Sequence, residues 1–174
     1  MQFLDRQQIT DLWTDDFDGL NDGYWITLNS KNRVKNFTDP LVKYKLSNLA
    51  VQVGKYVMQL NEYCYRRQYL KRRPGAELRC LVGYEIGDKD DPNRDGQMLH
   101  AHIVAAHDGS TNRTVSDVER ITRTKWSKFQ KFAPDGNFIH VEDLDNVRDR
   151  VWYISKQAVA FQRWHGGELN VMLT

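Results

Sequence analysis

Two alternating runs of residues, separated by a polar segment, predict a β-hairpin near the middle of the chain. Residues 78–87 and 97–106 each alternate between an apolar set and a more polar or smaller set of side chains. Because successive side chains of a strand point to opposite faces, each run has one face suited to a core. Residues 88–96 are polar and form the connecting loop. The two runs therefore predict an antiparallel sheet with one apolar face.

The second run carries two histidines one residue apart. His100 and His102 point to the same face, opposite to the apolar residues that flank them. Pairing across the loop places Glu85 roughly opposite His100 or His102, depending on the register. Two imidazoles and a carboxylate with open positions suit Mn²⁺ or Mg²⁺ better than a closed structural zinc site. Gly83, on the same face, would leave room for a nucleic acid backbone.

The other segments predict further strands and helices around this hairpin. Strands are expected at residues 24–29 and 138–141, where aromatic and β-branched residues gather. A long amphipathic helix follows Asp39-Pro40, with Asp39 as N-cap, and stops before Pro74. A second helix opens at residues 116–119, interpreted as a capping box, and runs toward Phe132. The resulting fold class is α+β, an antiparallel sheet with helices on its apolar face and the site on the uncovered face.

The last predicted helix carries a possible nucleophile. Its buried stripe runs from Val147 to Phe161, and the helix ends at Gly166-Gly167. Tyr153 lies off this stripe, on the flank where Lys156 also projects. A phenol is a poor nucleophile at its ordinary pKa near 10, but a metal that polarises a phosphate and a neighbouring cation can activate it. The pattern therefore favours attack of Tyr153 on a phosphodiester.

Length and charge indicate one domain with an uneven charge distribution. The 174 residues suffice for a single domain, and the net charge is +2. Aspartates concentrate in residues 1–22, which we interpret as an acidic N-terminal extension. Two basic clusters follow, and each suits either a phosphate backbone or a solvated helix face. The clusters comprise Arg66, Arg67, Lys71, Arg72 and Arg73, and Arg113, Arg120, Arg123, Lys125, Lys128 and Lys131.

The chain has the features of a cytoplasmic protein inside a host cell. No apolar run approaches the roughly 18 residues of a membrane span. The first residues do not form the basic head and apolar stretch of a signal peptide. Cys64 and Cys80 form no Cys-x-x-Cys motif, and we expect both thiols to stay reduced. We therefore expect no membrane partner.

Three segments together resemble the HUH endonuclease superfamily. The strand 99–103 is similar to its histidine–hydrophobic–histidine signature. Tyr153 and Lys156 resemble the tyrosine motif of its rolling-circle replication initiators. Residues 25–29 (Trp-Ile-Thr-Leu-Asn) are similar to the first, structural motif of those proteins. The three motifs occur in the family's order and span residues 24–160.

The resemblance implies an RRM-like sheet and a defined reaction. His100 and His102 would be metal ligands, with Glu85 as a third ligand that varies across the family. Tyr153 would attack single-stranded DNA or an origin hairpin, forming a 5′-phosphotyrosyl link and freeing a 3′-hydroxyl, with Lys156 assisting. Such a protein initiates rolling-circle replication of a plasmid or phage-like element, together with a host helicase and polymerase.

Further sequence features indicate which type of HUH endonuclease the chain resembles. No second tyrosine lies four residues from Tyr153, which indicates the single-tyrosine type. No phosphate loop of the Gly-x-x-x-x-Gly-Lys-Ser/Thr type is present, so a helicase would be a separate protein or domain. The histidines precede the tyrosine, unlike the order in conjugative relaxases.

Two other functions remain open at this point. A single-tyrosine transposase of the same superfamily would transfer strands between element ends instead of nicking an origin. A module that only binds single-stranded nucleic acid would use the sheet face without cleavage. We also expect Trp25, Trp126 and Trp152 to be core residues, and His107, His140 and His165 to have structural roles.

Overall fold

The computed structural model describes residues 5–20, 22–35, 39–65, 77–87, 97–131, 138–165 and 171–173, with side chains described as far as residue 156. The elements, in chain order, are α1 (Arg6–Asp15), β1 (Asp22–Val34), α2 (Val42–Tyr65), β2 (Arg79–Ile86), β3 (Gln97–His107), α4 (Val115–Gln130), β4 (Ile139–Asp143), α5 (Val147–His165) and β5 (Val171–Leu173). The predicted α+β class is confirmed.

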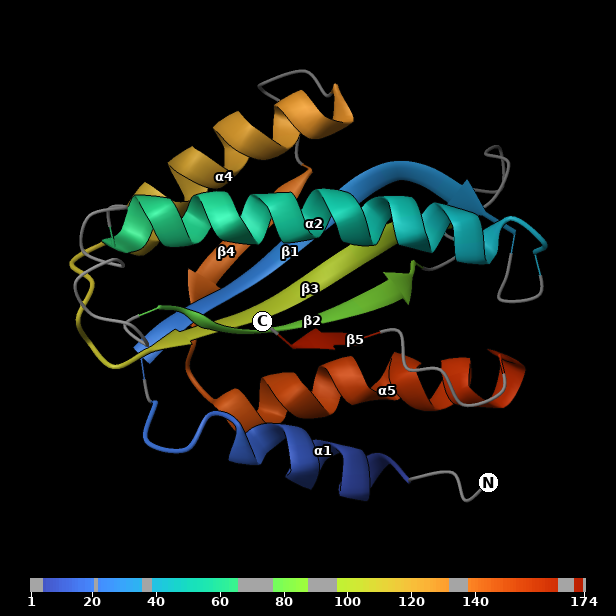
Figure 1. Ribbon diagram of the computed structural model, residues 1–174, viewed down its shortest axis with the longest axis horizontal. Coiled ribbons are helices and arrows are strands. Elements are labelled where there is room, and N and C mark those ends of the chain that lie inside the picture. Colours follow the sequence, from blue (N-terminus) through green and yellow to red (C-terminus); the bar gives the residue numbers. More distant parts are fainter. Residues whose placement is uncertain are drawn as a thin grey trace.

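The strands form one sheet in the order β4-β1-β3-β2-β5, and every neighbouring pair is antiparallel (Figure 1). Strand β3 lies at the centre, between β1 and β2. The predicted hairpin is confirmed as the β2–β3 pair. In its register, Glu85 lies opposite His100 and Gly83 lies opposite His102.

One face of the sheet packs against α2 and α4 (Figure 1). Alternate residues of β2 and β3 enter this core, as their period-2 pattern predicts. They are Leu78, Cys80, Val82, Tyr84 and Ile86 from the first run and Leu99, Ala101, Ile103 and Ala105 from the second. The apolar stripe of α2 meets them through residues such as Leu49, Val53 and Leu60, none of which is exposed by more than 1%.

The opposite face of the sheet is also covered by helices, which corrects the prediction of an uncovered site face. A second core lies there, under α1 and α5. Its members come from both helices, from the strand positions that alternate with the first core and from the segments that follow α1 and β4. They are Ile9, Trp13, Phe17, Trp25, Leu81, Val104, Ala106, Leu144, Val151 and Ile154. The molecule therefore has three layers, with the sheet in the middle (Figure 1).

The acidic N-terminal segment contains a helix that was not expected. Asp5 caps α1 in a capping box with Gln8, and Ile9 and Trp13 are buried on one face of the helix. Residues of α1 pack against α5. Most aspartates of this segment therefore lie on or next to a helix that belongs to the folded domain, and Asp22 begins β1.

Two helices begin at positions different from those predicted. The α2 helix starts at Val42, because Asp39 first makes a turn in which its Oδ1 accepts from the Leu41 amide at 2.8 Å. The N-cap of α4 is Thr114, whose side chain accepts from the amide of Asp117 and forms the capping box with it. The box predicted at residues 116–119 is therefore wrong by two residues.

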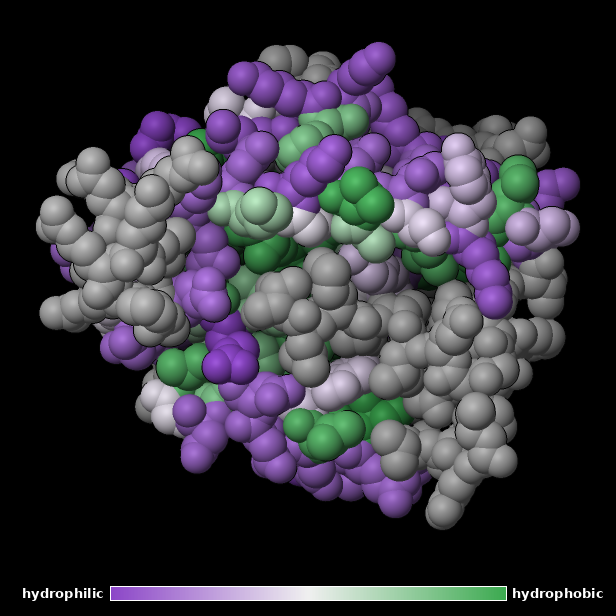
Figure 2. All heavy atoms as spheres, in the orientation of Figure 1, coloured by the Kyte–Doolittle hydropathy of each residue, from purple (hydrophilic) through white to green (hydrophobic). Residues whose placement is uncertain are grey.

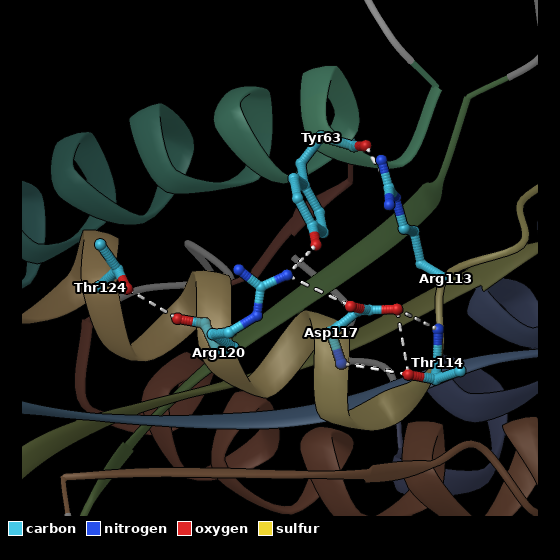
Figure 3. A network of polar contacts seen from close by, with 6 residues as sticks. All are labelled: Tyr63, Arg113, Thr114, Asp117, Arg120 and Thr124. Atoms are coloured by element: carbon cyan, nitrogen blue, oxygen red, sulfur yellow. Dashed lines mark hydrogen bonds and ion pairs between the residues drawn. The ribbon is translucent and has the colours of Figure 1, made fainter.

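The described arginines of the second basic cluster have partners within the fold. Arg113 lies 4.3 Å over the Tyr63 ring and donates to the Tyr63 carbonyl, while Arg120 donates to the Tyr63 hydroxyl and to Asp117 (Figure 3). Arg123 pairs with Glu119. The contacts with Tyr63 join α2 to α4 and to the segment before it, on the sheet face opposite Tyr153. These partners favour the interpretation of the cluster as a solvated helix face.

Several predictions fall outside the described residues. They are the end of the long helix before Pro74, the basic cluster at residues 66–73 and the glycines at 166–167. Over the part of the chain that is described, none of the helices combines the length and apolarity needed to cross a membrane. Figure 2 shows isolated hydrophobic residues among hydrophilic ones where α2 faces the viewer.

Candidate functional site

Glu85 is the centre of a cluster that joins β2, β3 and α5. Its Oε2 lies 2.8 Å from His102 Nε2 and accepts a hydrogen bond from the Tyr153 hydroxyl at 3.1 Å. Its Oε1 accepts from Lys156 Nζ at 3.3 Å. Four of the five residues predicted for the site therefore meet around one carboxylate.

The Glu85 carboxylate is ionised over a wide pH range. Its side chain is only 12% exposed, and burial by itself raises the pKa of the carboxyl group. The hydrogen bond and the electrostatic interaction with His102, together with the contact to the Lys156 ammonium group, act in the opposite direction and outweigh it. The pKa of Glu85 falls to about 2. At neutral pH Glu85 is thus a permanent acceptor and a possible ligand for a cation.

His102 is held by two residues of β1. Thr27 Oγ1 lies 3.1 Å from His102 Nδ1, and the two residues are paired in the sheet. The Trp25 ring stacks on the imidazole with centroids 5.2 Å apart and planes 8° from parallel. Since the carboxylate of Glu85 can only accept, His102 Nε2 carries a proton in this arrangement. A metal at Nε2 would replace that proton, with Nδ1–H donating to Thr27, as is usual for ligating histidines.

Gly83 allows α5 to approach β2 closely. A Cβ atom at position 83 would lie 2.3 Å from Cγ2 of Ile154, far inside van der Waals contact. The side chain of Ile154 occupies the space that the missing Cβ leaves, and Tyr153 precedes it on the helix. The expectation that Gly83 makes room for a nucleic acid backbone is therefore wrong, because a helix of the same chain fills that space.

His100 lies on the same face as His102, with ring centroids 6.4 Å apart. Its ring occupies the space next to Gly87, where a Cβ atom would meet His100 Nε2 at 2.8 Å. Among the residues that the structure describes, no three His, Cys, Asp or Glu side chains are grouped as a metal site requires. Chemically, the donor set of two imidazoles and one ionised carboxylate fits Mn²⁺ or Mg²⁺ with water completing the shell.

Tyr153 lies at the boundary between this cluster and solvent. The residue is 41% exposed, while Val151 and Ile154 beside it are buried, as the predicted helix stripe requires. Its ring makes edge contacts with both His102 and Trp25, at 5.2 and 5.9 Å between centroids. Lys156 Nζ lies 5.4 Å from the centre of the phenol ring. A phenol that is accessible, oriented on two sides and close to a cation is suited to act as a nucleophile.

Sequence reasoning missed the roles of Thr27 and Trp25. Both lie on the predicted strand 24–29, and their spacing of two residues places them on one face. That spacing was the available signal, but the pairing of β1 with β3 was needed to bring them to His102. Trp152 was expected in the core and is instead 40% exposed, whereas Trp25 and Trp126 are buried as predicted.

The histidines outside the cluster were expected to be structural. His107 is buried and its Nδ1 accepts from the amide of Gly109 in the turn after β3. His140 is exposed and lies 3.0 Å from Glu142 on β4. The side chain of His165 lies outside the described ones.

Comparison with models of protein families, with curated proteins and with solved structures found no match. A function for this protein therefore rests on the geometry of the cluster around Glu85.

Proposed function

We propose that this protein is a metal-dependent, single-tyrosine DNA endonuclease of the HUH type that nicks a single-stranded origin to initiate rolling-circle replication. The observation that carries this proposal is that the Tyr153 hydroxyl and the His102 imidazole both contact Oε2 of Glu85. The proposed nucleophile on α5 and the proposed metal ligands Glu85 and His102 on two strands then lie within the dimensions of a single phosphate group.

The sheet topology supports the proposal. The units β1-α2-β2 and β3-α4-β4 interleave to give the order β4-β1-β3-β2, with both helices on one face. This is the β-α-β-β-α-β arrangement that RRM-like domains share. The strand with both histidines is central in that sheet, and the helix with Tyr153 follows the second unit.

The proposed metal ligands are His102, Glu85 and His100. The first two already lie in contact, and with a metal at Nε2 the Nδ1–H of His102 would donate to Thr27, as is usual for a ligating histidine. A bound Mn²⁺ or Mg²⁺ would polarise the phosphate and neutralise charge that develops on its oxygens.

The proposed reaction is a displacement at phosphorus. The phenol oxygen of Tyr153 bonds to the phosphorus atom, and the bond between phosphorus and O3′ breaks. The phenol loses its proton and the departing O3′ gains one, so that a 5′-phosphotyrosyl link and a free 3′-hydroxyl result. Reversal of the same step rejoins two strands, and neither direction needs an oxidant or an external energy source.

Lys156 has two functions in this proposal. Its ammonium group, 3.3 Å from Glu85 and near the phenol ring, favours the phenolate over the phenol. The same group can bind a non-bridging oxygen of the scissile phosphate once that phosphate displaces the contact with Glu85. Both functions require a positive charge at this position.

A covalent adduct is the decisive test. We expect protein incubated with Mn²⁺ and a randomised single-stranded DNA library to form a complex that survives denaturing electrophoresis. Tyr153→Phe should abolish the adduct and retain DNA binding, and EDTA should abolish it as well. Tyr44→Phe is a matched control, because Tyr44 is exposed on α2, on the other side of the sheet.

The outcomes separate the rival functions. Mass spectrometry should place the nucleotide on Tyr153. Binding without any adduct in all metals would contradict the proposal and favour a module that only binds single strands. An adduct that rejoins preferentially to a second, unrelated DNA end would favour transposition over origin nicking.

A further inference from the structure

Trp152 presents an aromatic surface next to the proposed nucleophile. The residue is 40% exposed although its neighbours Val151 and Ile154 are buried. Its position is maintained by Arg6 of α1, whose guanidinium carbon lies 3.9 Å from the centre of the indole ring. The same guanidinium donates to the Trp152 carbonyl at 2.5 Å from Nη2 and to Ser155 Oγ at 3.2 Å from Nε.

Trp152 and Lys156 lie on the same side of Tyr153 around α5. At about 100° per residue, Lys156 lies about 60° and Trp152 about 100° around the helix from Tyr153, in the same sense. The three side chains therefore form a continuous band on one face of the helix. The band extends from the Tyr153 phenol past the Lys156 ammonium group to the Trp152 indole, on which the Arg6 guanidinium lies.

We propose that Trp152, flanked by Arg6 and Lys156, is a stacking site for a nucleobase of the single-stranded DNA whose phosphate is bound at Tyr153. This inference rests on the proposed function for the identity of the polymer. An indole offers a flat apolar face to any base, and cations beside it attract the adjoining phosphates. The combination of a large aromatic ring with two positive charges favours a nucleic acid over an apolar peptide.

The charges around this band also indicate on which side of Tyr153 a phosphate of the DNA would bind. Asp149 lies one turn before Tyr153 on a neighbouring part of the helix surface and would repel a phosphate. Lys156 lies almost one turn after Tyr153. We therefore place the scissile phosphate on the Lys156 side of Tyr153, and the base of an adjoining nucleotide over Trp152.

A purely structural role for Trp152 makes a different prediction. In that case the indole only serves to attach α1 to α5 through Arg6, and its removal would loosen the helices whatever ligand is present. A stacking site instead predicts an effect that depends on the presence of bases in the ligand. An oligonucleotide with abasic sugars keeps every phosphate and lacks the bases, and it separates the two roles.

The experiment measures equilibrium binding in the Tyr153→Phe background, so that no strand is cleaved. The ligands are oligo(dT) and an abasic oligonucleotide of equal length, each with a fluorescent label. We expect Trp152→Ala to weaken oligo(dT) binding about tenfold and to change abasic binding less than about twofold. Trp152→Phe should retain most of the affinity, because an aromatic face remains.

Two further variants complete the design. Trp152→Leu keeps an apolar side chain against α1 and should lose base-dependent affinity as Trp152→Ala does. Tyr44→Ala removes an aromatic residue that is 67% exposed on α2 and should leave both affinities unchanged. If Trp152→Ala weakened the binding of both oligonucleotides equally, or of neither, the proposed stacking site would be wrong. Absence of the covalent adduct, with base-dependent binding still observed, would contradict nicking but not the stacking site.

Discussion

At the residue scale, Glu85 is the group on which the candidate site depends, because it accepts from three side chains on two elements. Its pKa of about 2 lies below the ordinary value of 4.5. A carboxyl group with a lowered pKa in the folded state stabilises the fold above its ordinary pKa, and this contribution is lost as the pH falls toward the folded value.

This dependence gives a prediction for Glu85→Gln in metal-free protein. We expect the variant to be less stable than the natural chain at pH 7, by on the order of 1–3 kcal/mol. The difference should shrink between about pH 4.5 and pH 2, where the natural carboxylate gains its proton. Urea unfolding with EDTA at a series of pH values measures it. Parallel stability curves down to pH 2 would contradict the assigned interactions.

Predictions for single residues were correct where the two-residue alternation of a strand was sufficient to assign a side chain to a face of the sheet. The shared face of His100 and His102, and the presence of Glu85 on that face, follow from the alternation of two strands. The hydrogen-bond partner of Glu85 does not follow from the alternation, because it depends on the β2–β3 register together with the imidazole rotamers. Trp152 was misplaced although the helix period turns it away from the stripe of Val151 and Ile154, and its contact with Arg6, 146 positions away in the chain, could not be predicted.

At the scale of elements, the close approach of α5 to β2 decides where Tyr153 lies. Gly83→Ala would place a methyl group 2.3 Å from Ile154. We expect it to destabilise the fold by about 1–3 kcal/mol and to reduce adduct formation, because α5 must move outward. Ile154→Ala alone should cost about 2–5 kcal/mol through the cavity that it leaves.

The double variant tests whether the two effects share one cause. Truncation of Ile154 to alanine removes the 2.3 Å contact with Cγ2 and leaves only the contact of Cβ at 3.1 Å. The double variant should therefore be more stable than the sum of the single effects by at least about 1 kcal/mol. Denaturant unfolding of all four proteins gives the coupling energy. Additive effects would show that Gly83 is needed for a reason other than its contact with Ile154.

The α1 helix was not predicted from the sequence, although its signals were present. Its capping box of Asp5 and Gln8 and the apolar spacing of Ile9 and Trp13 were visible signals. The high density of aspartates nevertheless led to the interpretation of residues 1–22 as an extension. The face of the sheet that α1 covers could not be predicted, since it depends on contacts with α5, which lies at the other end of the chain.

At the scale of the whole molecule, the sheet separates two cores that need not open together. Counted over the described residues, which leave out the side chains of α5 beyond residue 156, the core under α2 and α4 is the larger one, and the core under α1 and α5 supports Tyr153. Elements that form fewer buried contacts open at lower free energy than the rest of a domain. The layer of α1 and α5 is therefore expected to be the first to open, and the nucleophile would lose its position with it.

Trp13→Ala tests this separation, with Leu12→Ala as a control on the neighbouring residue. Trp13 is 4% exposed in the second core and Leu12 is 58% exposed on the same helix. We expect Trp13→Ala to cost about 3–5 kcal/mol locally and Leu12→Ala to stay within about 0.5 kcal/mol. Hydrogen exchange should accelerate in α1 and α5 of Trp13→Ala, with slow exchange preserved in α2 and α4. Uniform acceleration in all four helices would mean that the two cores unfold as one unit, and that any loss of adduct in the variant reflects global stability instead of the position of Tyr153.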